Sequence, residues 1–351
     1  MRLQTVRSKL EEHNLDALLV SSWSNIFYLS GFTGSSALLF ITAENSILLT
    51  DFRYTEQAEE ETQDFEIVRI DSYPDTIAGL AQDYTRIGVE EEELSLIDYR
   101  KFQTALHSCQ LVDSSNILTK IRQIKDESEI HILRQIISMT DQAFLQIAKM
   151  IQPGMTEVEI SLELEFSLRK MGATDRSFDY IVASGLRSSL PHGVATEKKL
   201  EKNESLTLDY GGKYKGYCSD LTRTVFLGQP DSKQREIYNI VLEAQQAGIE
   251  ALKPGITGQE ADAVARQVMT KAGYGEYFGH GLGHALGIEV HETPRLNTRE
   301  TQILQPGMVI TVEPGIYIPG WGGVRIEDVI LVNDNGVEVL TQAPKQFIII
   351  D

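Results

Sequence analysis

The sequence predicts an α/β domain over residues 1–122, followed by an α+β domain over residues 123–351 that is built from two related halves. Two observations support this fold class. Short apolar runs give way to a long amphipathic helix at Asp126, and a stretch that begins at Pro153 recurs with substitutions from Pro254. With 351 residues, of which 42% are hydrophobic and 24% charged, the chain is long enough for two domains with sizeable cores.

The first domain alternates helical patterns with short apolar runs. A helix is expected from the N-terminus to about His13, and another from about Tyr54. The runs DALLV, SALLFIT and SILLTD lie between them and are typical of buried strands. This alternation predicts a small α/β domain.

The second domain opens with DESEIHILRQIISMTDQAFLQIAKMI, an amphipathic helix with an acidic first turn that ends at Pro153-Gly154. The stretches PGMTEVEISLELEFSLRKMGA and PGITGQEADAVARQVMTKAGY then align without a gap, at an offset of 254 − 153 = 101 residues. Part of this similarity is general to helix starts, because both copies begin with a Thr-x-x-Glu capping box. However, each copy also follows a long helix and precedes glycine-bounded strands. We therefore expect a pseudo-twofold internal repeat with a site between its halves.

Charge and cysteine content limit the class of protein. The net charge of −19 argues against nucleic acid or an anionic membrane as a partner. Only Cys109 and Cys218 are present, too few for a disulfide framework. The N-terminal stretch has no apolar signal core, and no apolar run approaches the roughly 18 residues of a membrane span. These features predict a cytoplasmic protein.

Three of the seven histidines lie in one glycine-rich stretch, GHGLGHALGIEVHE. A helix would place His280 and His284 on one face, as in zinc-binding helices, but the four glycines oppose a helix. We expect a loop and a strand instead. On this stretch alone, the histidines could be turn residues that happen to cluster.

Four acidic residues are expected to form two facing pairs. A hairpin in SLTLDYGGKYKGYCSDLTRTVFLG would set Asp209 across from Asp220, and one in MVITVEPGIYIPGWGGVRIEDVILV would set Glu313 opposite Glu327. Any one of these acids could be a surface residue or a salt-bridge partner. Two opposed pairs on two apolar hairpins favour a cation site, because the carboxylates otherwise repel and lose hydration.

Two divalent ions would balance the negative charge of four carboxylates. Carboxylates can bridge two metal ions that lie about 3.5–4 Å apart. One imidazole would complete the ligand set, which gives the histidine-rich stretch a role. Oxygen-rich ligation with a single nitrogen suits Mn²⁺ best, with Co²⁺, Zn²⁺ and Fe²⁺ as alternatives.

With these residues assembled, the chain resembles the pita-bread metallopeptidases of the creatinase/aminopeptidase type, and among them the Xaa-Pro peptidases aminopeptidase P and proline dipeptidase. The resemblance covers nearly the whole chain, including a creatinase-type N-terminal domain. It is strongest at SFDYIVASGLRSSLPHG, LDYGGKYKGYCSDLTRT, FGHGLGHALGIEVHE, GMVITVEPGIYIPG and GGVRIED. Small departures occur at Tyr180 and Tyr210, where Thr and Phe are frequent.

The resemblance implies a role for each candidate residue. Asp209 would bind one metal, Asp220 and Glu327 would bridge both, and His284 and Glu313 would bind the other. The substrate-handling and proton-handling histidines would be His192, His280 and His291, and Arg325 would offset surplus carboxylate charge beside the substrate. The expected enzyme hydrolyses the Xaa-Pro bond at the N-terminus of peptides and forms a homodimer.

The chemistry of the site follows from two metals, which lower the pKa of a shared water toward neutrality. Glu313 is the candidate general base, and His291 and His192 are candidates to stabilise the oxyanion or protonate the leaving proline nitrogen. Arg295 is a candidate to grip the free carboxylate of a dipeptide. Two alternatives stay open: an enzyme like methionine aminopeptidase, and a non-catalytic pita-bread binding module.

Overall fold

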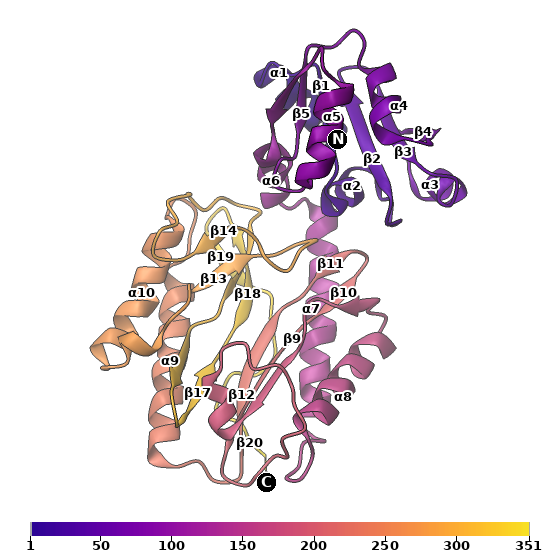
Figure 1. Ribbon diagram of the computed structural model, residues 1–351. Helices are drawn as coiled ribbons and strands as arrows, with labels where there is room; N and C mark the ends of the chain where they lie inside the picture. Colours follow the sequence, from indigo (N-terminus) through magenta and orange to yellow (C-terminus); the bar gives the residue numbers. More distant parts are fainter. Residues whose placement is uncertain (1, 351) are drawn as a thin grey trace. The chain divides into compact units, whose positions relative to one another are not determined.

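The computed structural model describes residues 2–350 and divides the chain into two compact units, one up to Arg122 and one from Gln123 (Figure 1). Among the described residues, no helix combines the length and the apolarity that a membrane span requires.

The N-terminal unit is built on one six-stranded mixed sheet with the strand order β4-β3-β2-β1-β5-β6. Strand β1 runs parallel to β5 and antiparallel to β2. The strands are β1 Ala17–Val20, β2 Ala37–Thr42, β3 Ser46–Thr50, β4 Glu66–Arg69, β5 Arg86–Val89 and β6 Gln110–Asp113. The helices are α1 Arg2–Glu12, α2 Trp23–Ser30, α3 Thr55–Glu61, α4 Tyr73–Leu80, α5 Leu96–Ala105 and α6 Ser115–Gln123.

The apolar runs of the first domain form the centre of this sheet, as predicted. DALLV, SALLFIT and SILLTD become β1, β2 and β3, and every residue of β1 and β3 is buried. The expected helices up to His13 and from Tyr54 are α1 and α3. The sequence patterns did not single out α2, whose N-terminus is held by Glu90: its carboxylate accepts the backbone N–H groups of Ser21 and Ser22 at 2.6 and 2.8 Å.

Four helices of the second unit form two pairs. They are α7 Glu127–Ile147, α8 Glu157–Lys170, α9 Ser232–Ala251 and α10 Gly258–Lys271. The predicted capping boxes at Thr156 and Thr257 are both present and start α8 and α10, which have 14 residues each. The long helix predicted from Asp126 is α7, and Asp126 caps it.

The strands of the second unit form four sheets. These have the orders β20-β12-β9-β8, β14-β13-β15-β18-β19, β11-β10-β7 and β16-β17. The strands of the first half and the C-terminal strand are β7 Asp175–Arg176, β8 Ile181–Ser184, β9 Ser205–Tyr210, β10 Gly212–Tyr214, β11 Tyr217–Cys218, β12 Leu221–Leu227 and β20 Ile349–Ile350. Those of the second half are β13 Gly283–Ala285, β14 Glu292–Leu296, β15 Val309–Val312, β16 Gly315–Ile318, β17 Gly322–Arg325, β18 Asp328–Asn333 and β19 Gly336–Val339.

The two halves flank a common set of strands, with α7 and α8 on one side and α9 and α10 on the other (Figure 1). Each half has its own apolar core. Ile136, Leu164 and Leu208 belong to the first core, and Val241 and Ile310 belong to the second. Between these cores, the inner strands carry the acidic residues of the site.

Two turns place those acidic residues. Lys215 and Gly216 form a two-residue loop between Tyr214 and Tyr217, and both have positive φ, at 47° and 82°. This geometry matches the right-handed twist of the flanking strands. Gly320, with φ of 75°, turns the chain between β16 and β17. Both hairpins predicted from the sequence therefore form.

Candidate metal and substrate site

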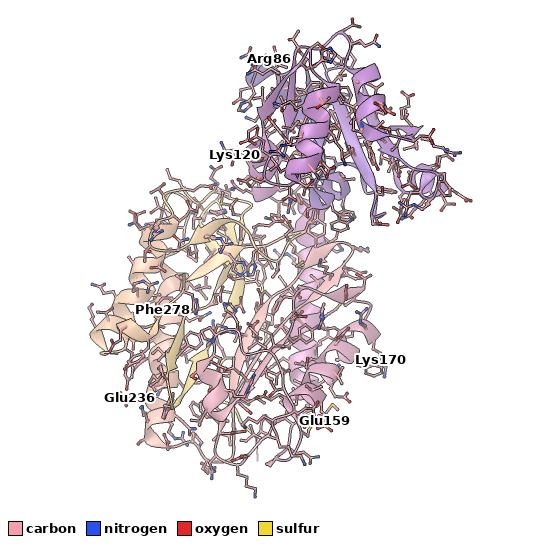
Figure 2. The ribbon with its side chains drawn as sticks, viewed as in Figure 1. Arg86, Lys120, Glu159, Lys170, Glu236 and Phe278 are labelled. Atoms are coloured by element: carbon pink, nitrogen blue, oxygen red, sulfur yellow. The ribbon has the colours of Figure 1, made fainter. Side chains whose placement is uncertain are left out.

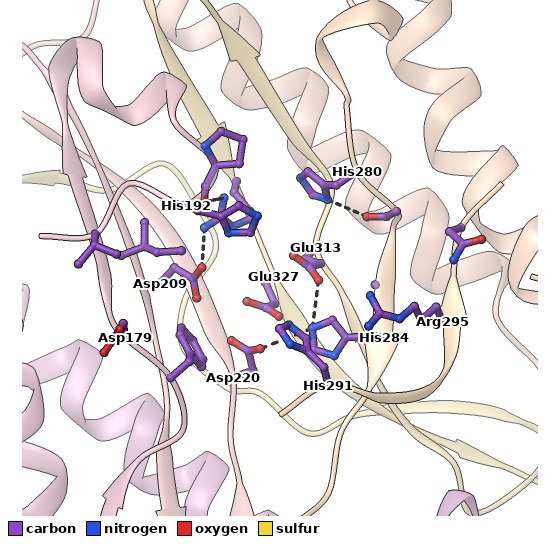
Figure 3. A pocket seen from close by; sticks show the side chains of 18 residues that line it. Asp179, His192, Asp209, Asp220, His280, His284, His291, Arg295, Glu313 and Glu327 are labelled. Atoms are coloured by element: carbon purple, nitrogen blue, oxygen red, sulfur yellow. Dashed lines mark hydrogen bonds and ion pairs between the residues drawn. The ribbon is translucent and has the colours of Figure 1, made fainter. Parts of the chain in front are cut away.

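All ten side chains predicted for the site line one cavity of about 560 Å³ in the second unit (Figure 3). They are His192, Asp209, Asp220, His280, His284, His291, Arg295, Glu313, Arg325 and Glu327. The first three come from the first half of the internal repeat and the other seven from the second. The cavity therefore joins the two halves.

The first acidic pair is diagonal rather than directly opposed. Strands β9 and β12 pair Asp209 with Thr222, and the β10–β11 ladder continues the same register, so residue 220 falls opposite residue 211. Side chains alternate along a strand, which puts Asp220 on the same face as Thr222 and hence near Asp209. The expectation of two carboxylates directly across from one another is wrong for this pair by two residues, although both line the cavity.

The second acidic pair is directly opposed, as predicted. Val312 pairs with Asp328 at the end of the β15–β18 ladder, and Gly315 pairs with Arg325 at the start of the β16–β17 ladder. Glu313 and Glu327 lie in the break between these ladders. Their side chains consequently face each other without a backbone ladder between them.

Asp220, His284 and Glu327 each offer one ligand atom, and these atoms lie within 4.8 Å of one another. His284 lies on β13, so the glycine-rich stretch forms loop and strand, as predicted. His284 Nδ1 lies 3.1 Å from the carbonyl oxygen of Ala285, which can only accept. In the neutral ring Nε2 then carries a lone pair, at 3.3 Å from Glu313 Oε1 and 3.7 Å from Asp220 Oδ2. A neutral ring whose lone pair faces two carboxylates fits a cation held between them.

An unpartnered atom also points to a cation. Glu327 Oε2 accepts a hydrogen bond from the Thr222 hydroxyl at 2.8 Å, whereas Glu327 Oε1 is buried and has no hydrogen-bond partner. A buried carboxylate oxygen without a partner is costly. The donor set therefore fits a metal, which would satisfy Oε1.

Burial and mutual repulsion set the charge balance of the acids. Burial raises the pKa of Asp209, and Glu313 adds to this while Arg325 opposes it. Burial, and then the charges of neighbouring carboxylates, raise the pKa of both Asp220 and Glu327 well above the ordinary range. For Glu313, burial alone would raise the pKa, but a protonated His284 ring would donate a hydrogen bond and a positive charge that lower it to about 2. Asp220 and Glu327 thus resist ionisation unless a cation joins them.

Arg325 links the acids to a histidine through a tyrosine. Its Nη2 lies 2.5 Å from Asp209 Oδ2, and its Nη1 donates to the Tyr317 hydroxyl at 2.7 Å. That hydroxyl lies 2.8 Å from His280 Nε2, while His280 Nδ1 lies 2.8 Å from the carbonyl oxygen of Gly281. The carbonyl requires an N–H at Nδ1, so in the neutral ring Nε2 accepts from Tyr317. Burial lowers the pKa of His280 and raises that of Tyr317 to about 12, which favours both neutral forms.

The remaining three candidates line the cavity and are exposed. His291 is edge-on to His284, with ring centroids 4.5 Å apart, and burial lowers its pKa. Arg295 pairs with His284 across β13 and β14 and has an exposed side chain. His192 is also exposed and follows the strand end of β8 by eight residues. These three side chains are available to a ligand.

Sequence reasoning missed two residues of this network, Thr222 and Tyr317. Thr222 lies two residues after Asp220 and Tyr317 four after Glu313, so strand alternation places each on the face of a recognised acid. This period of two was a usable signal. Arg325, predicted to contact substrate, already donates to Asp209, Tyr317, Thr222 and the Pro191 carbonyl.

The family described as "Metallopeptidase family M24" matches residues 131–334. The chain belongs to metallopeptidase family M24. The "Creatinase/Prolidase N-terminal domain" matches residues 2–124, so both parts of the predicted M24 architecture are confirmed.

Relatives of this M24 protein align along its whole length. The structure of an Xaa-Pro dipeptidase from Bacillus anthracis is 46% identical with a TM-score of 0.96, and the alignment covers 99% of this chain and 98% of that one. The X-Pro aminopeptidase from Thermotoga maritima is 38% identical with a TM-score of 0.92, covering 99% and 100%. An Xaa-Pro dipeptidase of Pyrococcus horikoshii is 38% identical over 97% of this chain and 96% of its own. The M24 fold and the predicted family are therefore confirmed.

Proposed function

We propose that this metallopeptidase hydrolyses the Xaa-Pro bond at the N-terminus of proline-containing peptides, with two divalent metal ions per subunit. The observation that carries the proposal is a cavity lined by four carboxylates and one imidazole, in which Glu327 Oε1 has no hydrogen-bond partner. Relatives with Xaa-Pro activity in their names support the substrate class.

The proposed ligands are Asp209, Asp220, His284, Glu313 and Glu327. When bound, the metals supply Lewis acidity and lower the pKa of a water molecule. Four carboxylates with one nitrogen favour Mn²⁺, with Co²⁺ or Zn²⁺ as substitutes. Arg325 holds Asp209 at 2.5 Å, and so fixes the direction of that carboxylate.

The protein's own groups handle protons and substrate. Glu313 lines the cavity 3.3 Å from His284 Nε2, and its carboxylate is the candidate to accept the proton of an attacking water. The leaving proline nitrogen must gain a proton, and the exposed imidazoles of His192 and His291 line the cavity for this step or for holding the oxyanion. Because His280 Nε2 already accepts a hydrogen bond from the Tyr317 hydroxyl, we propose that His280 shapes the substrate pocket and does not transfer protons.

The length of the substrate depends on Arg295. A dipeptide presents a free carboxylate beside its proline ring, and an exposed guanidinium that lines the cavity can bind it with two parallel hydrogen bonds. A longer peptide presents an uncharged amide there. We propose that dipeptides are accepted and that Arg295 recognises them.

We further propose a homodimer in the cytoplasm. The resemblance to dimeric relatives motivates the dimer, and the N-terminal unit has exposed apolar side chains, among them Phe52, Leu96 and Ile97, at 69%, 64% and 64%. Cys109 and Cys218 are free thiols, which fits a reducing compartment. Sedimentation equilibrium measures the mass in solution.

The proposed function is tested with protein purified without chelators. Metal content is measured first, and then hydrolysis of Xaa-Pro, Xaa-Pro-Yaa-Zaa and Met-Ala is compared in Mn²⁺. We expect two metals per chain and cleavage of the prolyl substrates only. Preferential cleavage of Met-Ala would favour the methionine aminopeptidase alternative, and absence of bound metal and of all hydrolysis would favour a binding module.

A further inference from the structure

Two loops bring candidate substrate histidines to the cavity. His192 lies between a 3₁₀ turn at Gly185–Ser189 and Thr196, and His280 lies between a 3₁₀ turn at Gly275–Tyr277 and β13. Neither histidine belongs to a helix or strand. Both loops are instead tied to side chains of α8 and α10, the two helices of the internal repeat.

Glu157, the first residue of α8, is fully buried and closes the His192 loop. Its Oε1 accepts the Ser184 N–H at 2.8 Å and the Ser184 hydroxyl at 2.9 Å. Its Oε2 accepts Arg187 Nη1 at 2.8 Å, and the Thr196 N–H and hydroxyl at 3.1 and 2.7 Å. One carboxylate therefore joins the residue before the loop to the residue that ends it.

Asp262 and Arg266 of α10 hold the His280 loop in a similar way. The carboxylate binds Arg266 at 2.8 and 2.9 Å, and Asp262 Oδ1 also accepts the Leu282 N–H at 3.1 Å. Arg266 donates to the carbonyl oxygens of Phe278 and His280 at 2.8 and 2.9 Å. Three alternate residues of this glycine-rich segment, Phe278, His280 and Leu282, thus each form one backbone hydrogen bond with the Asp262–Arg266 pair. Since glycine permits many backbone conformations, such ties define the segment.

The two carboxylates are not equivalent positions of the repeat. At the offset of 101 residues Glu157 aligns with Gly258, and Asp262 aligns with Ser161. The two halves therefore reach the same arrangement with different residues. This shared arrangement would be a coincidence if the contacts served only to attach each helix to its sheet, a task that the apolar cores already perform.

We infer that Glu157, and Asp262 together with Arg266, are positioning residues that set where His192 and His280 stand in the cavity. The inference rests on the proposed function for its kinetic test. Neither carboxylate lines the cavity, so both act only through the loops. Displacement of a reacting or binding group by about 1 Å costs up to roughly 100-fold in rate.

The test uses isosteric variants with a matched control on each helix. In Glu157→Gln, the amide NH₂ must face either the Ser184 N–H or the Thr196 N–H, both of which can only donate, so one of the two ties to the loop is lost. Glu159→Gln is the control, because Glu159 lies two residues further on, is exposed and bonds only its own helix cap (Figure 2). For α10 the pair is Asp262→Asn with the control Glu260→Gln, again a cap residue.

We expect Glu157→Gln and Asp262→Asn to lower kcat/KM on an Xaa-Pro substrate by about 10- to 100-fold, with the controls close to wild type. Metal affinity of the Glu157 variant, measured by calorimetry, should stay at the wild-type value, because His192 is not a proposed ligand. Imidazole NMR signals of His192 should shift in that variant and not in its control. Equal kcat/KM and unshifted signals in variants and controls would overturn the inference.

A different result separates the inference from the proposed function. If metal-loaded wild type cleaves no prolyl substrate, the proposed function fails, while the NMR comparison still decides the positioning role. If Glu157→Gln does not fold, Thr196→Val replaces it, because this change removes one hydroxyl hydrogen bond to the Glu157 carboxylate. For α10, Arg266→Lys keeps a positive charge beside Asp262 but lacks the guanidinium that donates to the carbonyl oxygens of both Phe278 and His280. A kcat/KM within error of wild type in both substitutes would also overturn it.

Discussion

Glu313 and Glu327 face each other in a break between two strand ladders, with Val312 paired to Asp328 on one side and Gly315 paired to Arg325 on the other. If the two ladders were continuous, the backbones of Glu313 and Glu327 would pair with each other like those of their neighbours. The break leaves two acids side by side, and only Glu313 has a basic partner at hand, His284 at 3.3 Å. The apo site therefore stores repulsion that metal binding relieves.

This repulsion predicts an unusual pH dependence of stability in the metal-free protein. The pKa of Asp220 is raised in the folded state, so the folded form binds its proton more tightly than the unfolded form. The contribution of Asp220 to folding stability is fully present at pH values below its ordinary pKa of 3.8. It is lost as the pH rises toward the raised pKa of the folded state. Asp220→Asn should therefore stabilise the apo protein at pH 7, because the neutral amide avoids burying a charge among neighbouring carboxylates.

Urea unfolding of both apo proteins between pH 4 and 8 measures this effect. The stability advantage of Asp220→Asn should grow with pH and vanish near pH 4. Glu313 behaves in the opposite sense, since its pKa is lowered to about 2 and its contribution is lost as pH falls from its ordinary 4.5 toward that value. A pH-independent difference between the two apo proteins would contradict the assignment of repulsion to Asp220.

Removal of metal should abolish hydrolysis and lower the melting temperature. A ligand present at 100 times its dissociation constant stabilises the folded state by about 2.7 kcal/mol. Calorimetric melts before chelation, after dialysis and after Mn²⁺ is restored give the comparison. Full activity in a preparation that elemental analysis shows to be metal-free would refute the proposed function.

Tyr317→Phe should weaken both the fold and the site. The change leaves His280 Nε2 and one donor of Arg325 without their shared hydroxyl partner. A buried polar group left unsatisfied costs about 1–3 kcal/mol. Tyr274→Phe is the control, because that hydroxyl bonds Glu236 in an exposed position at 3.3 Å. Indistinguishable unfolding free energies and kcat/KM for the two variants would show that the Tyr317 hydroxyl is dispensable.

Arg295→Ala should discriminate between substrates of different length. If the guanidinium binds the free carboxylate, the variant loses about 1.5–3 kcal/mol of binding on Xaa-Pro dipeptides, while longer peptides barely change. Arg299→Ala, an exposed arginine four residues on, controls for loss of charge. Equal losses on both substrate lengths would make Arg295 a general support, and no loss on either would shift the choice toward aminopeptidase P.

The sequence by itself determined most of the secondary structure that carries the site. Thr156 and Thr257 caps, apolar runs such as SALLFIT and the glycines of GHGLGH act over a few residues, because capping, strand burial and helix breaking are local effects. The spacing of acids along two hairpins was likewise readable, since a turn relates positions close in the chain.

Only the tertiary structure decided how these local pieces meet. The register that places Asp209 beside Thr222 rather than Asp220 follows from the two-residue loop at Lys215 and Gly216, whereas the sequence pattern indicates a turn in this stretch without showing which two residues form its loop. The route from His280 through Tyr317 to Arg325, and the closure of the His192 loop by Glu157, join residues from separate elements. Such contacts arise when buried polar groups must find partners across a packed interior, and that requirement acts on the folded chain as a whole.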